Sequence, residues 1–207
     1  MTAAWQPLPA LALGYFLGAI PTALWLCRMW FGADITQLGS RNPGMTNVWR
    51  VFGWKPALPV AFIDAAKGAL AAGLGAAITG SASWALWTGV AAIIGHSFSF
   101  WSRFKGGKGV LTAFGVFLYL SPVATLAAFA LWGAVMAISR FVSLSSVLAA
   151  FALPASVYLE SGWRGRGGIT PGFWAACLVG AFVVIRHRSN MIRLFRGTEP
   201  RFQGKVR

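Results

Sequence analysis

The sequence predicts an all-α integral membrane protein with about seven transmembrane helices, an outer N-terminus and a cytoplasmic C-terminus. Of its 207 residues, 57% are hydrophobic and only 11% are charged, whereas about 25% of the residues of a soluble domain are charged. Long apolar runs recur along the chain. The basic residues fall mainly in alternate connections between these runs, as they do in multispanning membrane proteins.

The apolar runs divide into helices, for which one span of the hydrocarbon core takes about 20 residues. In chain order they cover residues 8–31, 57–79, 84–100, 111–120, 122–138, 142–159 and 171–185. Pro21 predicts a kink in the first helix. Ser121-Pro122 divides a stretch that is too long for one span into two short, tilted helices. The first run is too long for a cleaved signal peptide and lacks its basic leading end, so we expect one polytopic membrane domain over residues 1–207.

The distribution of basic residues predicts the orientation. With the N-terminus outside, fifteen of the eighteen Lys and Arg residues lie in inner loops, at inner helix ends or in the tail, and only Arg164 and Arg166 lie in outer loops. This satisfies the positive-inside rule. If residues 111–138 formed a single helix, Arg140 and the tail would move outside, so seven spans fit the charges better. Every polar cluster then lies on the cytoplasmic face.

The net charge of +14 indicates anionic headgroups and phosphorylated small molecules as partners, and no nucleic acid, because the basic residues occupy short loops beside apolar segments. Topology alone accounts for much of this charge. Cys27 and Cys177 lie in apolar runs and are interpreted as buried thiols. No group of His, Cys and carboxylate residues has the spacing of metal ligands, so we expect no metal and no cofactor.

The most polar segment runs from Gly39 to Arg50, between two apolar runs. Pro43-Gly44 is a turn signal, so we expect a loop with exposed backbone N–H groups. Its neutral hydrogen-bonding side chains include Ser40, Asn42, Thr46 and Asn47. Arg50 adds a planar fork that matches phosphate oxygens. The alternative is an interfacial loop that caps a helix, which would need fewer donors.

A second polar segment, Lys-Gly-Gly-Lys-Gly, runs from Lys105 to Gly109. The glycines at 106, 107 and 109 free the backbone to form an anion-binding nest, with Lys108 as a point charge above it. The segment is not a nucleotide-binding P-loop, because no Ser or Thr follows Lys108 and Ser102 stands where that pattern needs glycine.

Two further clusters follow at later helix ends. Arg140, Ser143 and either Ser145 or Ser146 would point one way at a helix start, or would be an interfacial arginine with packing serines. His187 and Asn190 are three residues apart and share one helical face.

Three titratable residues fall inside predicted spans. Asp64 and Lys67 are three residues apart, so they either neutralise each other or mark a functional site. His96 lies late in the third predicted helix and has a structural or a catalytic function.

These clusters, in this order and spacing, resemble the bacterial acyl-phosphate:glycerol-3-phosphate acyltransferases, the PlsY family. The resemblance spans roughly residues 10 to 200, with departures at Met45, Ser99 and Leu111. The matching pieces are Gly39-Ser40-x-Asn42-Pro43-Gly44-x-Thr46-Asn47-Val48-x-Arg50, Asp64-x-x-Lys67-Gly68, Gly95-His96, Phe104-Lys105-Gly106-Gly107-Lys108-Gly109-Val110, Arg140-x-x-Ser143-x-x-Ser146 and Arg186-His187-x-x-Asn190-x-x-Arg193-Leu194.

The resemblance implies transfer of a fatty acyl group from acyl phosphate to the 1-hydroxyl of glycerol 3-phosphate. The products would be lysophosphatidate and inorganic phosphate, at the entry to phospholipid biosynthesis. It implies a multi-pass enzyme of the bacterial inner membrane, without a cofactor, whose active site lies on the cytoplasmic face. Its partners would be the two substrates, the bilayer and an enzyme that produces acyl phosphate.

The resemblance also implies residue roles. His187, Ser40 and Lys108 would be catalytic, and the glycine segment would hold the donor phosphate. The substrate-binding residues would be Asn42, Thr46, Asn47, Arg50, Gly106, Gly107, Gly109, Arg140, Ser143, Ser146 and Asn190. The proton of the attacking hydroxyl would pass to a substrate phosphate oxygen or to His187, and the sequence leaves that choice open.

Two other classes of protein fit the sequence less well. A transporter or channel for phosphorylated metabolites is expected to show inverted repeats with broken midplane helices, and the break at Ser121-Pro122 has no matching partner. A structural membrane protein that binds anionic lipid would not need amide and hydroxyl side chains, such as those of Asn42, Thr46 and Asn190, beside its basic residues.

Overall fold

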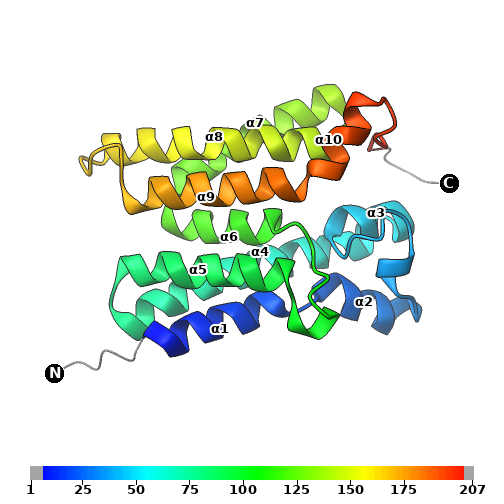
Figure 1. Ribbon diagram of the computed structural model, residues 1–207, viewed down its shortest axis with the longest axis horizontal. Coiled ribbons are helices and arrows are strands. Elements are labelled where there is room, and N and C mark those ends of the chain that lie inside the picture. Colours follow the sequence, from blue (N-terminus) through cyan, green and yellow to red (C-terminus); the bar gives the residue numbers. More distant parts are fainter. Residues whose placement is uncertain (1–6, 203–207) are drawn as a thin grey trace. The chain divides into compact units, whose positions relative to one another are not determined.

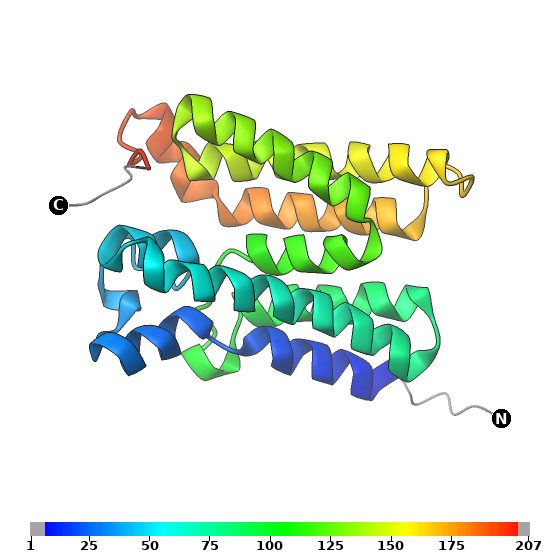
Figure 2. The same cartoon turned by 180° about the vertical axis from the view of Figure 1, so that it is seen from behind.

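A computed structural model describes residues 7–202, and every regular element among them is a helix. This confirms the all-α prediction. Figures 1 and 2 show the helices from opposite sides. The α-helices are α1 (Pro7–Ala19), α2 (Thr22–Phe31), α3 (Met45–Phe52), α4 (Trp54–Thr79), α5 (Ala82–Ser97), α6 (Val110–Leu120), α7 (Pro122–Ser139), α8 (Val142–Trp163), α9 (Pro171–Arg186) and α10 (Arg188–Phe195), with 3-10 turns η1 (Ile35–Gln37) and η2 (Phe100–Ser102).

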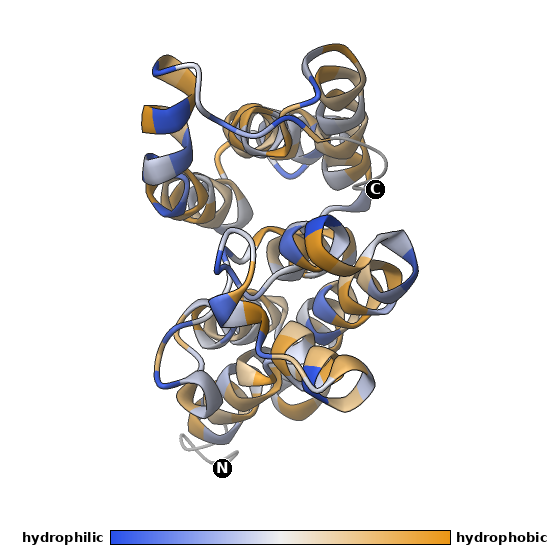
Figure 3. Cartoon of the chain, turned by 90° about the vertical axis from the view of Figure 1, so that its right-hand side faces the viewer, coloured by the Kyte–Doolittle hydropathy of each residue, from blue (hydrophilic) through white to orange (hydrophobic). Residues whose placement is uncertain are grey.

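Much of this helical structure is long and apolar enough to cross a membrane. Within residues 7–202, four segments meet the length and hydropathy of a span: Pro7–Phe31, Trp54–Thr79, Pro122–Ser139 and Val142–Trp163. Helices α6 and α9 are apolar but shorter. In Figure 3 orange and pale residues make up most of the helices, and blue residues lie in several connecting segments and in some helical turns. The number of spans, seven, and their orientation stay predictions.

The first predicted helix is interrupted at Pro21, as expected. Helix α1 ends at Ala19 and α2 begins at Thr22, because proline has no N–H to continue the helical ladder. The carbonyl of Ile20 instead accepts hydrogen bonds from the Thr22 N–H and from Lys67 Nζ, both at 3.0 Å. A side chain of α4 therefore satisfies backbone that the kink exposes.

Two short helices correct the sequence-based assignment. Helices α3 and α10 lie where the sequence predicted a loop over residues 32–56 and a tail from Arg186, in which only His187 and Asn190 were placed on a helical face. An eight-residue helix has little stability by itself, and it persists through tertiary packing of one face. In α3 that face buries Asn47 and Val48, and in α10 it buries Asn190. The predicted helix over 84–100 also ends earlier, at Ser97, and continues as η2.

The described chain forms two compact units, residues 7–116 and 117–202. A single domain over the whole chain therefore stays a prediction. In the first unit α5 packs against α1 and α4. A Cβ added to Gly18 would overlap the backbone of Ala92, and one added to Gly95 would overlap the carbonyl of Tyr15. Glycine at these positions lets α1 and α5 approach closely, as small residues do in membrane helix pairs.

In the second unit α8 packs against both α7 and α9. Glu160 near the end of α8 is buried, and its Oε2 accepts the N–H of Ala124 at 2.7 Å. Ala124 lies in the first turn of α7, whose N–H groups have no helical acceptor. Arg164 Nη2 lies 2.9 Å from the other oxygen of Glu160. The carboxylate thus ties α7 to α8, a contact that sequence reasoning missed because its partners are 36 residues apart.

Candidate active site

Asn47 organises the loop that carries the first motif. Its side chain is buried; Nδ2 donates to the carbonyls of Ile35 and Leu38 at 3.2 and 3.0 Å. Its Oδ1 accepts the N–H of Ser40 at 2.8 Å. These three bonds hold residues 35–40 against α3 and fix the backbone of Ser40, whose own side chain is exposed. The geometry favours a positioning role for Asn47, and its direct contact with a substrate stays a prediction.

The other polar residues of this motif lie around the start of α3. Thr46 and Arg50 are both half-buried and four residues apart on α3, so they share one face of the helix. Asn42 precedes the helix and is also half-buried. The expected loop with exposed N–H groups is therefore shorter than predicted, because the backbone is helical from Met45 onward.

The glycine segment is docked on the end of α5. The N–H of Gly106 donates to the carbonyl of Ser97, and that of Gly107 donates to the carbonyl of His96, both at 3.2 Å. A Cβ at Gly106 would overlap the His96 carbonyl, and one at Gly107 would overlap the His96 ring. The two N–H groups are thus not the free anion nest suggested by the sequence. Contact of these glycines with a phosphate stays a prediction.

Beyond these glycines the segment leads into α6. Gly109 has φ 80°, in the left-handed region that favours glycine. Its carbonyl accepts the N–H of Ala113 at 2.8 Å, which starts α6. Lys108 is half-buried directly before this helix start. A helix N-terminus beside a lysine is favourable for a phosphate group.

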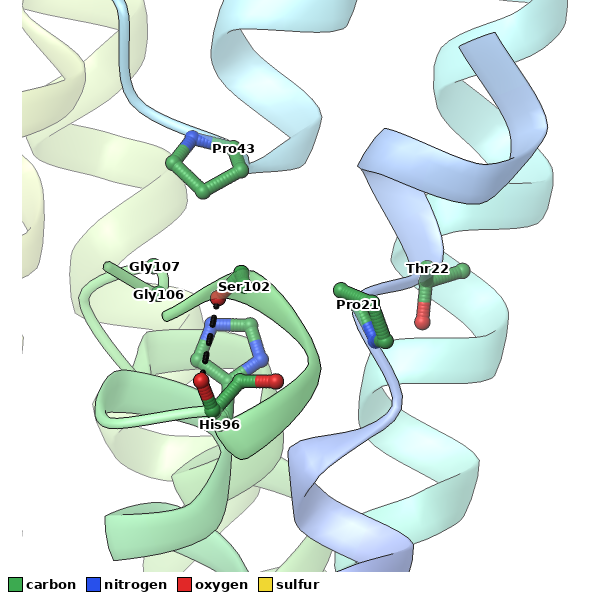
Figure 4. A pocket seen from close by; sticks show the side chains of 8 residues that line it. Pro21, Thr22, Pro43, His96, Ser102, Gly106 and Gly107 are labelled. Carbon is green, nitrogen blue, oxygen red and sulfur yellow. Dashed lines mark hydrogen bonds between the residues drawn. The ribbon is translucent and has the colours of Figure 1, made fainter. Parts of the chain in front are cut away.

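A small open pocket joins the first two motifs within the first unit. It is lined by Pro21, Thr22, Pro43, His96, Ser99, Ser102, Gly106 and Gly107, most of which are labelled in Figure 4. Pro43 comes from the first motif and the two glycines come from the second. The fold therefore brings segments that are some sixty residues apart in the sequence to one opening.

Beside this pocket lies a buried polar network centred on Asp64. Its Oδ1 accepts hydrogen bonds from Thr22 Oγ1 at 2.9 Å and pairs with Lys67 Nζ at 2.7 Å. His96 Nδ1 lies 3.6 Å from the same oxygen, just beyond hydrogen-bond distance. Asp64 and Lys67 do form the mutual pair considered from the sequence. Sequence reasoning missed that Lys67 also donates to the Ile20 carbonyl beside the kink at Pro21, and that Asp64 faces His96.

A second polar cluster lies in the second unit and is centred on Glu199. Its Oε1 accepts from Ser143 Oγ and Asn190 Nδ2, both at 2.7 Å, and its Oε2 accepts from Arg193 Nε at 2.8 Å. Burial by itself would raise the pKa of Glu199, but the hydrogen bonds from Asn190, Ser143 and Arg193 and the charge of Arg193 outweigh it and lower the pKa below its ordinary value. Ser143 and Asn190 were predicted site residues. Glu199 was missed, and its signal was a lone carboxylate in a basic tail.

His187 lies at the junction of α9 and α10 and is buried. Its Nδ1 lies 2.8 Å from the carbonyl of Val183, which requires the proton on Nδ1 in the neutral ring. Nε2 is then the ring nitrogen that can accept a proton. This tautomer suits a general base.

Arg140 and Ser146 lie apart from the hydrogen bonds around Glu199. Arg140 ends α7 in the left-handed conformation, with φ 60°, and its carbonyl accepts the N–H of Phe202 at 2.7 Å. Ser146 Oγ donates to the Val142 carbonyl at 2.8 Å and accepts from Trp132 Nε1 at 3.3 Å. Ser145 similarly donates to its own helix. The roles predicted for Arg140 and Ser146 stay predictions.

The contribution of the polar cluster centred on Glu199 to the free energy of unfolding can be tested by mutation. Replacing Glu199 by Gln turns one oxygen into an NH₂ group that faces donors, and we expect a loss of about 1.5–3 kcal/mol. Because the folded pKa is lowered, the stabilisation by Glu199 is complete above the unfolded value of about 4.3 and is lost as the pH falls through the folded pKa. Thermal unfolding in detergent should therefore show a wild-type advantage at neutral pH that shrinks on acidification. Arg196→Gln, at an exposed neighbour, is the control, and a pH-independent difference would contradict this account.

Comparison with known proteins identifies the family of the chain. The family described as glycerol-3-phosphate acyltransferase matches residues 8–197. A glycerol-3-phosphate acyltransferase of Synechococcus sp. (strain JA-3-3Ab) is 44% identical over 192 residues, covering 93% of this chain and 91% of that protein. Glycerol-3-phosphate acyltransferase 1 of Deinococcus radiodurans is 45% identical over 199 residues, covering 95% and 96%.

The fold is similar to that of a crystal structure of PlsY (YgiH), described as an integral membrane glycerol 3-phosphate acyltransferase, in its glycerol 3-phosphate form. The TM-score is 0.84 at 33% identity, with 95% of this chain and 96% of that one covered. The lysophosphatidic acid form gives a TM-score of 0.82 at 32% identity, covering 96% of each chain. Fold and sequence therefore define an integral membrane acyltransferase of phospholipid biosynthesis. The chain belongs to the glycerol-3-phosphate acyltransferase family of PlsY.

Proposed function

We propose that this enzyme transfers a fatty acyl group from acyl phosphate to the 1-hydroxyl of glycerol 3-phosphate. The observation that supports it most is the pocket shared by the two phosphate-suited motifs, which Pro43 lines together with Gly106 and Gly107. The relatives are named for glycerol 3-phosphate. A donor that is itself a phosphate explains why a second phosphate-suited segment, with Lys108 at the start of α6, lies beside the first.

The acyl phosphate is a mixed anhydride and is already activated, so the enzyme mainly has to position the substrates and stabilise charge. The 1-hydroxyl oxygen attacks the acyl carbon directly, and a new ester C–O bond forms. The bond from that carbon to the phosphate oxygen breaks, and inorganic phosphate leaves with the electron pair. His187 Nε2 or a phosphate oxygen of the substrate takes the hydroxyl proton.

The residues divide between the substrates according to their chemistry. The glycine segment, with Gly106, Gly107 and Gly109, and the start of α6 hold the donor phosphate. The family resemblance assigns glycerol 3-phosphate to Ser40, Asn42, Thr46, Arg50, Lys108, His187 and Asn190, and adds Asn47, Arg140, Ser143 and Ser146 as further substrate-binding residues. The basic inner loops favour an active site on the cytoplasmic face of the bacterial inner membrane. A separate enzyme that produces acyl phosphate would supply the donor.

An acyl transfer assay tests the donor. The purified protein in lipid vesicles is given labelled glycerol 3-phosphate together with palmitoyl phosphate, palmitoyl-CoA or palmitoyl acyl carrier protein. We expect labelled lysophosphatidate from palmitoyl phosphate alone. Product from palmitoyl-CoA or palmitoyl acyl carrier protein instead would show that the donor is a thioester and not an acyl phosphate. If the folded protein gives no product with any donor, transport of phosphorylated metabolites becomes the favoured function.

Replacing Lys108 by Ala should lower kcat/KM without loss of folded protein. A charged hydrogen bond contributes about 1.5–3 kcal/mol, which corresponds to a roughly ten- to hundredfold decrease. Initial rates at varied concentrations of both substrates measure it. Lys55→Ala, at an exposed lysine before the apolar part of α4, is the matched control and should stay within about twofold of wild type. Equal activity of the two variants would remove Lys108 from the site.

A further inference from the structure

The segment between α5 and the glycines exposes an unusual number of aromatic side chains. Phe100, Trp101 and Phe104 are 57, 53 and 59% exposed. Arg103 and Lys105 alternate with them and are also exposed. A connecting segment in water normally carries small polar residues. Interleaved aromatic and basic residues are instead typical of the boundary between lipid headgroups and acyl chains.

These aromatic rings form a continuous row. The ring of Phe104 lies 6.4 Å from that of Phe100, which lies 5.6 Å from Trp101. Trp101 in turn lies 6.1 Å from Trp25 of α2, which is exposed as well. We call these four residues the aromatic row. It belongs entirely to the first unit.

Much of the backbone beside and after the row is hydrogen-bonded within the protein. All six N–H groups from residue 102 to residue 107 donate to carbonyls of residues 96–102, at 2.8–3.2 Å. The hydroxyl of Ser99 donates to the carbonyl of Ala19, which anchors the segment to α1. Water would satisfy these donors at no cost, whereas backbone that enters a low-dielectric region must pair them internally. These six donors therefore need no water when the segment enters the headgroup region.

The segment also holds a strained conformation. Arg103 and Phe104 have φ values of 53° and 62°, and neither is glycine. Left-handed conformations of this kind cost of order 1–3 kcal/mol and persist where the surroundings require them. Here they close the tight turn that sets Phe104 against Phe100.

We propose that the aromatic row is a membrane-interface anchor, seated at the headgroup–acyl boundary with Arg103 and Lys105 on anionic phospholipid headgroups. Aromatic rings favour this depth, and each basic residue near an anionic surface adds to the attraction. Gly106 and Gly107 follow the row directly and line the pocket. The anchor thus places the pocket beside the headgroup region of the bilayer. It does not depend on which acyl donor the enzyme uses.

Spin labels test this depth. In a background of Cys27→Ala and Cys177→Ala, which removes both cysteines, single cysteines replace Phe100, Phe104 or Arg103. The controls are Phe62→Cys on the exposed apolar face of α4 and Arg166→Cys in an exposed connection. In phosphatidylglycerol vesicles, the ratio of oxygen to nickel-chelate accessibility at 100 and 104 should exceed that at Arg166 by about threefold and stay below that at Phe62. A ratio equal to that at Arg166 would overturn the proposal.

Two further measurements keep the test decisive. Replacing the phosphatidylglycerol by phosphatidylcholine should lower the ratio at position 104, and Arg103→Gln with Lys105→Gln should remove that difference. An unchanged ratio would overturn the headgroup contact. If labelled variants fail to fold, the conservative Trp101→Phe suffices. The difference in fluorescence between wild type and this variant is the emission of Trp101. Phospholipids brominated near the glycerol backbone should quench that emission, and absence of quenching would overturn the anchor.

Discussion

Replacing Asp64 by Ala is expected to lower the free energy of unfolding by about 3–5 kcal/mol, because it leaves the buried ammonium of Lys67 without its counter-charge. Both side chains are almost fully buried and 2.7 Å apart. The same change removes the acceptor of the Thr22 hydroxyl, at 2.9 Å, and the carboxylate that faces His96. Helix α4 would then lose its hydrogen bond to Thr22 as well as a charge, and only the bond from Lys67 to the Ile20 carbonyl would still join it to the kink at Pro21.

Thermal or denaturant unfolding of detergent-solubilised protein measures this loss. Asp64→Leu combined with Lys67→Met is the critical control, since removing both charges of a buried pair is often neutral or stabilising. The double variant should recover most of the stability that Asp64→Ala loses. Asp64→Ala within about 1 kcal/mol of wild type would show that Lys67 finds another partner or water.

Replacing Gly106 by Ala is expected to lower kcat/KM on the order of a hundredfold while leaving the helices folded. The added Cβ would overlap the carbonyl of His96 and approach the backbone of Ser97. Because these are backbone atoms at the end of α5, they cannot move aside as a flexible side chain does. The glycine segment would lift from α5, and a displacement of about 1 Å can cost on the order of a hundredfold in rate.

Acyl transfer rates per folded molecule, together with thermal unfolding, separate this local effect from global destabilisation. The matched control is Gly133→Ala in α7, where an added Cβ meets no atom within 4 Å. That variant should keep its activity and gain about 0.5–1 kcal/mol, the usual advantage of alanine over glycine inside a helix. Full activity of Gly106→Ala would show that the docked position of the segment does not matter.

The elements that depend on local composition were predicted well. The expected helices over 57–79 and 122–138 appear as α4, Trp54–Thr79, and α7, Pro122–Ser139. The breaks at Pro21 and at Ser121-Pro122 were also correct, because proline restricts its own backbone and lacks an N–H wherever it stands. Helix α3 was missed, and α10 was anticipated only through the helical spacing of His187 and Asn190, since eight residues carry too little local preference and rely on the residues they bury.

For the site residues too, local sequence predicted some features and tertiary packing determined others. The types and spacing of polar residues pointed to the family and to most of the candidate side chains. Spacing did not show that Asn47 is enclosed by carbonyls of residues 35 and 38, or that the N–H groups of Gly106 and Gly107 are taken up by α5. Glu199 was overlooked because its partner Ser143 is 56 residues away.

Composition, the length of the apolar runs and motif spacing already established that the chain is helical, apolar and a member of the glycerol-3-phosphate acyltransferase family. Hydrophobic length, proline positions and motif spacing are properties of the covalent chain and need no coordinates. The tertiary structure decided which polar groups are already paired: Asp64 with Lys67 and Glu199 with Ser143 and Asn190. Such pairing follows from the packing of distant helices, where a buried polar group must find whatever partner lies beside it in space.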